Sequence, residues 1–208
     1  MRPLFGTTVL VTALALLSSC RSGSDQGAPS PMAGSPIAAT SSPRDDRSIY
    51  ALPMMLTDQD GAKVGLDVFR GKPVFIGMFY GRCPSACPLL VSTIKATLAE
   101  LAPPAAAEVR VLLVSFDPEH DTPEALHSIV QQRGLDARWK LANAPEDQVR
   151  DLAEILGIRY RRLPDGSFSH TSSIVLLDRS GAIDTRLDDV SQSVQPLAAR
   201  ARAIAAGE

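Results

Sequence analysis

The 208-residue sequence has only three cysteines, one tryptophan and few aromatic residues of any kind (5%). Three cysteines are too few for the disulfide framework that holds small exported domains together, so each cysteine needs its own explanation. Charge of one sign is also lacking, because 21 Lys and Arg oppose 23 Asp and Glu and leave a formal net charge of −2. This balance offers neither the basic surface of a nucleic-acid-binding protein nor a polybasic membrane patch.

The N-terminal segment has an apolar run from Val9 to Leu17. The run is too short to cross a bilayer as a helix, which needs about 20 apolar residues, and it fits the hydrophobic region of a secretory signal. It ends in Leu17-Ser18-Ser19-Cys20, which resembles the bacterial lipobox, whose cysteine is diacylated and becomes the new N-terminus. We therefore predict a lipoprotein signal peptide over residues 1–19 and a lipid on Cys20. The protein would then be anchored in the bacterial cell envelope and face the periplasm or another extracytoplasmic side. The alternative is an ordinary signal peptide followed by a free thiol.

The rest of the chain divides into a tether and one domain. Residues 20–48 are rich in Pro, Ser and Gly and have no apolar period, which is typical of a flexible tether. Residues 49–208 carry the regular patterns and form the predicted domain. The apolar fraction is 45%, and about 160 residues bury roughly 70% of their unfolded surface, so this core needs no disulfide.

Within the domain, apolar runs typical of buried strands alternate with segments of helical period. Predicted strands cover residues 74–80, 109–116, 139–142, 174–177 and 182–187. Predicted helices cover residues 89–101, 123–133, 145–156 and 194–205. A turn signal at residues 58–61, between apolar segments at 52–56 and 62–66, predicts an N-terminal β-hairpin. Interleaved strands and helices predict an α/β sandwich.

Cys83-Pro84-Ser85-Ala86-Cys87-Pro88 lies between a predicted buried strand and a helix. Open α/β sheets carry their sites at such strand-to-helix junctions. Pro88 suits the first helical position, so we predict that Cys87 caps the helix and that Cys83 lies one tight turn upstream. The unpaired amides of a helix start favour negative charge, so the pKa of both thiols is expected to fall below the ordinary value of about 8.5.

Two thiols this close can form a disulfide or bind a soft metal such as Cu(I). A purely structural disulfide is one interpretation, although a five-residue loop constrains the unfolded chain little. Copper needs a further donor, and the imidazoles of His120, His127 and His170 are the candidates. His127 belongs to the solvent edge of a predicted helix, whereas His120 and His170 lie in loops beside predicted strands.

Several motifs, taken together, resemble the Sco/SenC family over residues 52–178. They are Gly71-Lys72-Pro73, Phe79-Tyr80-Gly81, Cys83-Pro84 with Cys87-Pro88, Ser115-Phe116-Asp117-Pro118-Glu119, Asp121-Thr122-Pro123, and His170 before Leu177-Asp178. The resemblance implies a thioredoxin-like sandwich with a central mixed sheet flanked by helices. It also implies a membrane-anchored protein that delivers copper to the dinuclear copper centre of cytochrome c oxidase, or reduces the thiols of that centre.

Carried over position by position, the resemblance makes Cys83, Cys87 and His170 the ligands of copper, as Cu(I), Cu(II) or both. Asp117 matches a recurrent acidic residue that would orient this site. The expected partners are a copper-accepting oxidase subunit and a thiol reductant, with the protein itself a monomer that binds no nucleic acid. The chain departs from the family pattern at three places. Ser85-Ala86 stands where the family often has an acidic residue between the cysteines, Ser169 stands where it often has Asp, and His120 stands where it usually has Arg.

The alternative function is that of a thiol–disulfide oxidoreductase that reduces a partner and holds no metal. Oxidoreductases of this fold resemble one another in a cis-proline before the strand that faces the cysteines. The corresponding segment here, residues 169–173, has no proline and supplies the imidazole of His170 instead. The sequence therefore favours a metallochaperone over an enzyme, with Cys83 and Cys87 as a redox-active pair in either case.

Overall fold

The computed structural model describes residues 47–208. The signal peptide predicted over residues 1–19, the lipid predicted on Cys20 and nearly all of the tether predicted over residues 20–48 lie outside the described residues. Within residues 47–208, no helix combines the length and the apolar character needed to cross a membrane.

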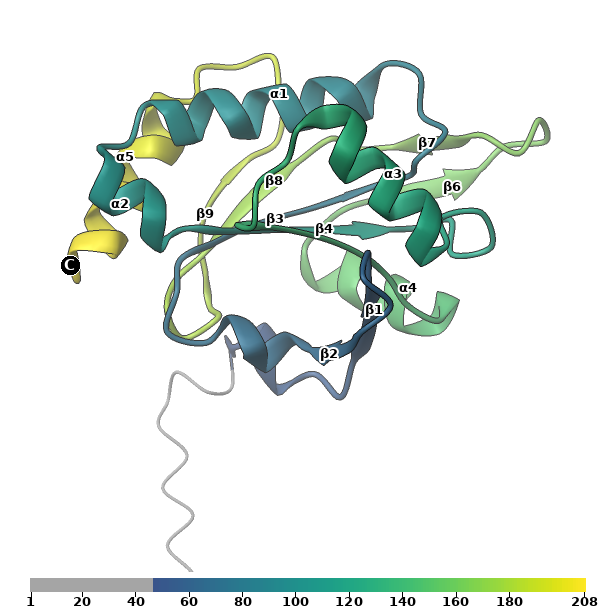
Figure 1. The fold of residues 1–208 in the computed structure, drawn as a ribbon, viewed down its shortest axis with the longest axis horizontal. Coiled ribbons are helices and arrows are strands. Elements are labelled where there is room, and N and C mark those ends of the chain that lie inside the picture. The colour runs from purple at the N-terminus through teal and green to yellow at the C-terminus, as the bar shows by residue number, and fades with distance from the viewer. Residues whose placement is uncertain (1–46) are drawn as a thin grey trace, which may run out of the picture. The chain divides into compact units, whose positions relative to one another are not determined.

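A seven-stranded mixed sheet forms the centre of this domain (Figure 1), with the strand order β2-β1-β5-β4-β3-β8-β9. The strands are β1 (Met55–Asp58), β2 (Lys63–Gly65), β3 (Val74–Phe79), β4 (Arg110–Ser115), β5 (Trp139–Asn143), β8 (Ile174–Leu177) and β9 (Ile183–Leu187). Strands β3, β4 and β5 are parallel to one another, and the other pairings are antiparallel. Every residue of β3 and β8 is buried, as expected for strands covered on both faces.

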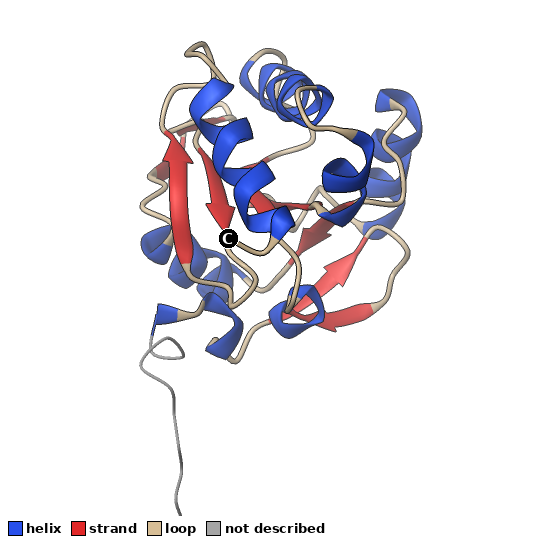
Figure 2. Ribbon diagram, turned by 90° about the vertical axis from the view of Figure 1, so that its left-hand side faces the viewer, coloured by secondary structure: helices blue, strands red, loops and turns tan. Residues whose placement is uncertain are grey.

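Helices cover both faces of the sheet (Figures 1 and 2). They are α1 (Ala86–Ala99), α2 (Pro103–Glu108), α3 (Pro123–Arg133), α4 (Glu146–Ile155) and α5 (Gln195–Ala206), with short 3₁₀ turns at Ile49–Ala51 and Leu66–Phe69. Because the chain steps from β3 to β4 to β5 in one direction, right-handed crossovers place α1 and α3 over the same face. Helix α4 lies under the opposite face in Figure 1.

Local signals in the sequence explain several of these boundaries. Thr122 caps α3 by accepting a hydrogen bond from the amide of Ala125 at 3.4 Å, and Pro123 occupies the first helical position. The same helix ends at Gly134, whose φ of 54° lies in the left-handed region that favours glycine. The start and the end predicted for this helix are both confirmed.

A second, two-stranded sheet joins β6 (Tyr160–Arg162) to β7 (Phe168–His170). In Figure 1 this β6–β7 hairpin lies at the end of the central sheet where the chain passes from β3 into α1. The hairpin therefore brings His170, the last residue of β7, to the same end as the cysteine loop.

The observed architecture confirms the predicted α/β sandwich and the N-terminal hairpin formed by β1 and β2. All the predicted strands and helices are present, with boundaries that differ by a few residues. Two features differ from the predictions. Pro103 and Pro104 begin the short helix α2 instead of only ending the helix before it, and the β6–β7 hairpin was not predicted.

Candidate metal centre

The loop between β3 and α1 carries both cysteines. The amide of Cys83 donates to the carbonyl oxygen of Tyr80 at 3.2 Å, which closes a turn just before the first cysteine. Helix α1 begins at Ala86 with Ser85 as its N-cap, so the prediction that Cys87 caps the helix is wrong. Pro88 is tolerated at the third helical position because the first four amides of a helix have no intrahelical partner.

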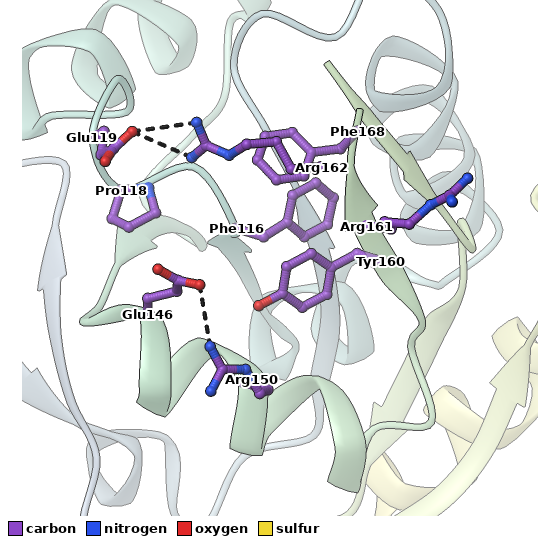
Figure 3. Close-up of a pocket in the computed structure, with 9 residues that line it drawn as sticks. All are labelled: Phe116, Pro118, Glu119, Glu146, Arg150, Tyr160, Arg161, Arg162 and Phe168. Carbon is purple, nitrogen blue, oxygen red and sulfur yellow. Dashed lines mark hydrogen bonds and ion pairs between the residues drawn. The ribbon is translucent and has the colours of Figure 1, made fainter. Parts of the chain in front are cut away.

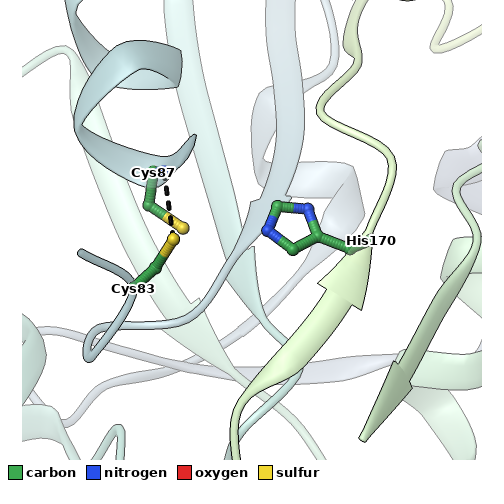
Figure 4. Close-up of side chains that lie close together, drawn as sticks. All are labelled: Cys83, Cys87 and His170. Atoms are coloured by element: carbon green, nitrogen blue, oxygen red, sulfur yellow. Dashed lines mark hydrogen bonds between the residues drawn. The ribbon is translucent and has the colours of Figure 1, made fainter. Parts of the chain in front are cut away.

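Both cysteines are free thiols, and both are nearly inaccessible, at 8% exposure for Cys83 and 6% for Cys87. The amide of Cys87 donates to Sγ of Cys83 at 3.3 Å (Figure 4). Burial alone would raise the pKa of the Cys83 thiol, but hydrogen bonds from the backbone amides of Cys87 and Ser85 outweigh burial and lower it. Burial raises the pKa of the Cys87 thiol far above its ordinary value. The prediction of two lowered pKa values therefore holds for Cys83 and is wrong for Cys87, whose sulfur receives too few amide hydrogen bonds to offset its desolvation.

His170 faces the two sulfurs from the β6–β7 hairpin (Figure 4). Its Nδ1 lies 3.1 Å from the carbonyl oxygen of Thr171. Because a carbonyl oxygen only accepts, Nδ1 carries the proton of the neutral ring and Nε2 keeps its lone pair. The two sulfurs and one ring nitrogen all lie within 4.8 Å of one another. The structure thus brings together three side chains that come from two distant segments of the chain.

Aromatic rings surround the imidazole. The ring of Tyr80 meets it edge-on at 6.0 Å between centroids, and the ring of Phe116 lies at 4.9 Å. Phe116 stacks in turn on Tyr160 at 5.0 Å and packs against Phe168 at 5.2 Å. These contacts fix the plane of the His170 ring and lower the local dielectric constant around the sulfurs.

The other two histidines lie elsewhere. His127 is on the exposed side of α3, where its ring contacts Asp60 at 3.5 Å and Gln131 at 3.0 Å. Nδ1 of His120 lies 2.9 Å from the carboxylate of Asp117. Neither imidazole joins the sulfurs, so of the three candidate histidines only His170 has the geometry of a third donor.

Asp117 is fully buried at the carboxyl end of β4 and forms ion pairs with two arginines. Its carboxylate accepts hydrogen bonds from Arg82 at 2.9 Å and from Arg162 at 3.3 Å, in addition to its contact with His120. Burial would raise the pKa of the Asp117 carboxyl, but the hydrogen bonds from His120 and Arg82 outweigh burial and lower it. Asp117, Glu119 and His120 are close enough to share an ion. Two guanidinium groups already neutralise these carboxylates, however, so this cluster is a poor cation site.

Asp121 is a buried residue beside the cysteine loop whose role the sequence did not reveal. It is 2% exposed, accepts a hydrogen bond from the Gly81 amide at 2.8 Å, and also accepts one from the Ser115 hydroxyl. A Cβ at position 81 would lie 2.4 Å from the Asp121 carboxylate, so the close approach requires glycine. In the sequence Asp121 stood out only as part of the Asp121-Thr122-Pro123 motif, which gave it no role of its own.

A cavity of about 280 Å³ lies beside these aromatic rings, and none of Cys83, Cys87 and His170 lines it (Figure 3). Phe116, Tyr160 and Phe168 form one wall of this cavity. Two ion pairs line the rim, Arg150 with Glu146 at 3.1 Å and Arg162 with Glu119 at 3.3 Å. The cavity is therefore separate from the sulfur site but shares the ring of Phe116 with it.

The donor set of the centre suits a soft ion. Thiolates and imidazole are ligands that copper accepts in either of its common oxidation states, whereas magnesium and calcium require oxygen donors. The buried sulfurs and the oriented imidazole therefore fit copper.

Comparisons with known proteins agree with this geometry. A family model described as SCO1/SenC matches residues 43–206. An SCO2-like protein of Rickettsia prowazekii is 23% identical over 152 residues, which cover 70% of this chain and 73% of that protein.

Two of the similar solved structures are ScoI proteins with copper bound. The protein from Bradyrhizobium japonicum has a TM-score of 0.64 and 25% identity, covering 74% of this chain and 98% of that one. The protein from Arabidopsis thaliana has a TM-score of 0.66 and 18% identity, covering 76% and 99%. The agreement confirms the expected thioredoxin-like fold.

Proposed function

The chain belongs to the SCO1/SenC family, and from this membership we propose that it is a copper metallochaperone that binds one copper ion through Cys83, Cys87 and His170. The observation that carries the proposal is the distance of at most 4.8 Å among the two sulfurs and a nitrogen of the His170 ring. Copper bound to the two similar ScoI proteins supports the choice of ion. Copper is the cargo of this protein and not a resident catalyst.

Three protein donors would leave the ion incompletely coordinated. A thiolate of an acceptor protein can then enter the open position and displace one donor at a time, so the ion moves without becoming free. The copper-accepting subunit of cytochrome c oxidase is the acceptor that we propose. A lipid on Cys20 and a tether over residues 20–48 would hold the domain of residues 49–208 near such a membrane-bound partner.

Copper uptake is coupled to protons and to the redox state of the thiols. Both sulfurs must be deprotonated to bind the ion, and the pKa of the Cys87 thiol is raised, so uptake should release protons and weaken in acid. Oxidation of Cys83 and Cys87 to a disulfide would remove two of the three donors. An exported form of this protein would therefore need a thiol reductant as its second partner.

Copper titration of the reduced protein tests the proposal. The wild-type protein should bind one Cu(I) per chain in competition with a chromogenic chelator, and the variants Cys83→Ala and His170→Ala should bind it more weakly. His127→Ala is the matched control, because that ring is exposed and lies on α3 away from the sulfurs. Full copper affinity in Cys83→Ala would refute the proposed ligand set.

Thiol–disulfide exchange is the second candidate function. It is favoured by the asymmetry of the pair, in which Cys83, the thiol of lowered pKa, could attack a partner disulfide and Cys87, the thiol of raised pKa, could resolve the mixed disulfide. Reduction of a model disulfide by His170→Ala separates the two functions. Unchanged reduction together with weakened copper binding would assign the histidine to the metal.

A further inference from the structure

The β6–β7 hairpin concentrates positive charge beside the histidine ligand. Residues 158–170 contain Arg159, Arg161 and Arg162 against the single acid Asp165, so this segment has a formal net charge of +2 in a chain whose net charge is −2. The carboxylate of Asp165 accepts hydrogen bonds from the amide of Ser167 at 2.9 Å and from its hydroxyl at 2.6 Å. The hairpin is therefore a basic surface on an otherwise acidic protein.

The three arginines differ in what they contact. Arg162 forms ion pairs with Asp117 and Glu119, each at 3.3 Å. Arg159 and Arg161 are exposed, and neither guanidinium has an ion pair or a hydrogen bond with another residue of the described part of the chain. These two positive charges are therefore available to a partner molecule.

The two unpaired arginines lie next to the proposed copper ligand. Arg161 is paired across the hairpin with Ser169, the residue before His170. The amide of Arg159 donates to the hydroxyl of Thr171, the residue after His170, at 3.1 Å. Successive side chains of a strand point to opposite faces, and Figure 3 shows Arg161 directed away from the aromatic rings. A molecule bound to both guanidinium groups would therefore lie close to His170 without displacing the rings packed against it.

We propose that Arg159 and Arg161 form a docking surface for acidic side chains of the copper-accepting protein. The inference rests on the proposed function, since it names the chemistry of that partner's surface. Arginine suits this role because its planar guanidinium donates two parallel hydrogen bonds to one carboxylate. An acceptor docked there is held next to His170, so its own ligands can reach the ion. Charge pairs of this kind speed the encounter and orient the partner more than they add affinity.

An anionic membrane surface also attracts arginine, but it fits these observations less well. Binding to anionic lipids through charge typically uses clusters of about four to eight basic residues. The docking surface has two unpaired arginines, and the chain as a whole is negatively charged. A membrane seated on this surface would also cover the approach to the copper ligands. The observations therefore favour an acidic protein surface.

Transfer of Cu(I) to the soluble copper domain of the same organism's cytochrome c oxidase tests the docking surface. The donor is the reduced full-length protein with Cys20→Ser, compared with its double variant Arg159→Gln/Arg161→Gln under second-order conditions. At low ionic strength we expect the double variant to transfer copper about tenfold more slowly, which is within the range that electrostatic steering contributes. Added salt should slow the wild-type transfer and remove most of this difference. Equal rates at low ionic strength would overturn the proposal.

Arg133→Gln is the matched control for the loss of an exposed arginine. Arg133 ends α3, which connects the parallel strands β4 and β5 and so returns to the opposite end of the sheet. This variant should transfer copper at the wild-type rate. A loss as large as that of the double variant would show that the effect is one of overall charge and would overturn the docking surface.

Substitution of Ser169 gives a complementary test. A carboxylate placed by Ser169→Asp lies directly across from Arg161 and would occupy that guanidinium within the chain. Ser169→Asp should therefore slow transfer at low ionic strength, whereas Ser169→Asn, which has the same shape without the charge, should not. Equal rates in these two variants would overturn the docking surface.

Further measurements distinguish failure of the docking surface from failure of the proposed function. The double variant should keep wild-type Cu(I) affinity, and a weakened affinity would show that the arginines act on the metal site and not on the partner. Co-sedimentation with phosphatidylglycerol vesicles that is lost in the double variant, while its transfer rate is unchanged, would assign the arginines to a membrane. Salt-independent transfer by the wild-type protein would overturn only the docking surface. A complete lack of transfer would refute the proposed acceptor, and the docking surface with it.

Discussion

The two thiols should differ strongly in reactivity although they are almost equally buried. Two variants isolate them: Cys87→Ser leaves Cys83, and Cys83→Ser leaves Cys87. Cys20 is replaced by serine in both proteins so that a single thiol remains. Exposure of 8% and 6% gives the two sulfurs similar access to a small reagent, so the difference must come from ionisation.

The direction of the difference follows from the hydrogen bonds. At pH 8 a thiol with the ordinary pKa of about 8.5 is roughly one quarter thiolate. Amide hydrogen bonds lower the pKa of Cys83, so its thiolate fraction exceeds this value, whereas burial raises the pKa of Cys87 and its fraction falls below it. A lower pKa also lowers the intrinsic nucleophilicity of the thiolate, so each tenfold gain in thiolate gives only about a threefold gain in rate.

Alkylation by iodoacetamide, followed by mass spectrometry, measures the outcome. We expect Cys83 to react faster than Cys87 at pH 8, by about tenfold or more, because the pKa of Cys83 is lowered and the pKa of Cys87 is raised far above the ordinary value. The rate at Cys83 should level off at a lower pH than the rate at Cys87. Equal rates, or a faster reaction at Cys87, would refute the assignment of the thiolate to Cys83.

Three further predictions concern stability. Phe116→Ala removes a ring that is 2% exposed and should cost about 3–5 kcal/mol in urea denaturation; a loss below about 1 kcal/mol would contradict its central packing. Gly81→Ala forces a Cβ to within 2.4 Å of the Asp121 carboxylate and should lower the thermal midpoint, and an unchanged midpoint would show that the loop yields freely. Burial would raise the pKa of the Asp58 carboxyl, but hydrogen bonds from Lys140 and from backbone amides outweigh burial and lower the pKa below 3.8. The ionised carboxylate therefore stabilises the fold fully above pH 3.8, and this stabilisation disappears as the pH falls through the lowered pKa. Asp58→Asn should therefore destabilise the protein more at about pH 7 than at about pH 2, as denaturation at each pH would show, and an equal loss at both would contradict the ionic origin.

Much of the fold could be predicted because its signals are local. The strand β3 is a continuous apolar run, and α3 has a capping threonine, a proline at its first position and a glycine at its end. Such signals act within a few residues and survive in the folded chain. The cysteine pair was found for the same reason, since four residues separate its members.

The remaining features depend on contacts between distant residues. The strand of Tyr160–Arg162 has only three residues, two of them exposed arginines, so it shows no alternation that would predict it. The high pKa of Cys87 results from tertiary burial, which a position at a helix start does not reveal. The arginine partners of Asp117 are 35 and 45 residues away in sequence. The spacing of His170 from the sulfurs could be expected only from the family resemblance.

X-ray absorption by the Cu(I)-loaded protein tests the central claim most directly. The wild-type protein should show two sulfur scatterers and one imidazole nitrogen around a single copper, and His170→Ala should lose the nitrogen while keeping both sulfurs. A sulfur-only shell in the wild-type protein, or an unchanged nitrogen in the variant, would contradict the site built from Cys83, Cys87 and His170.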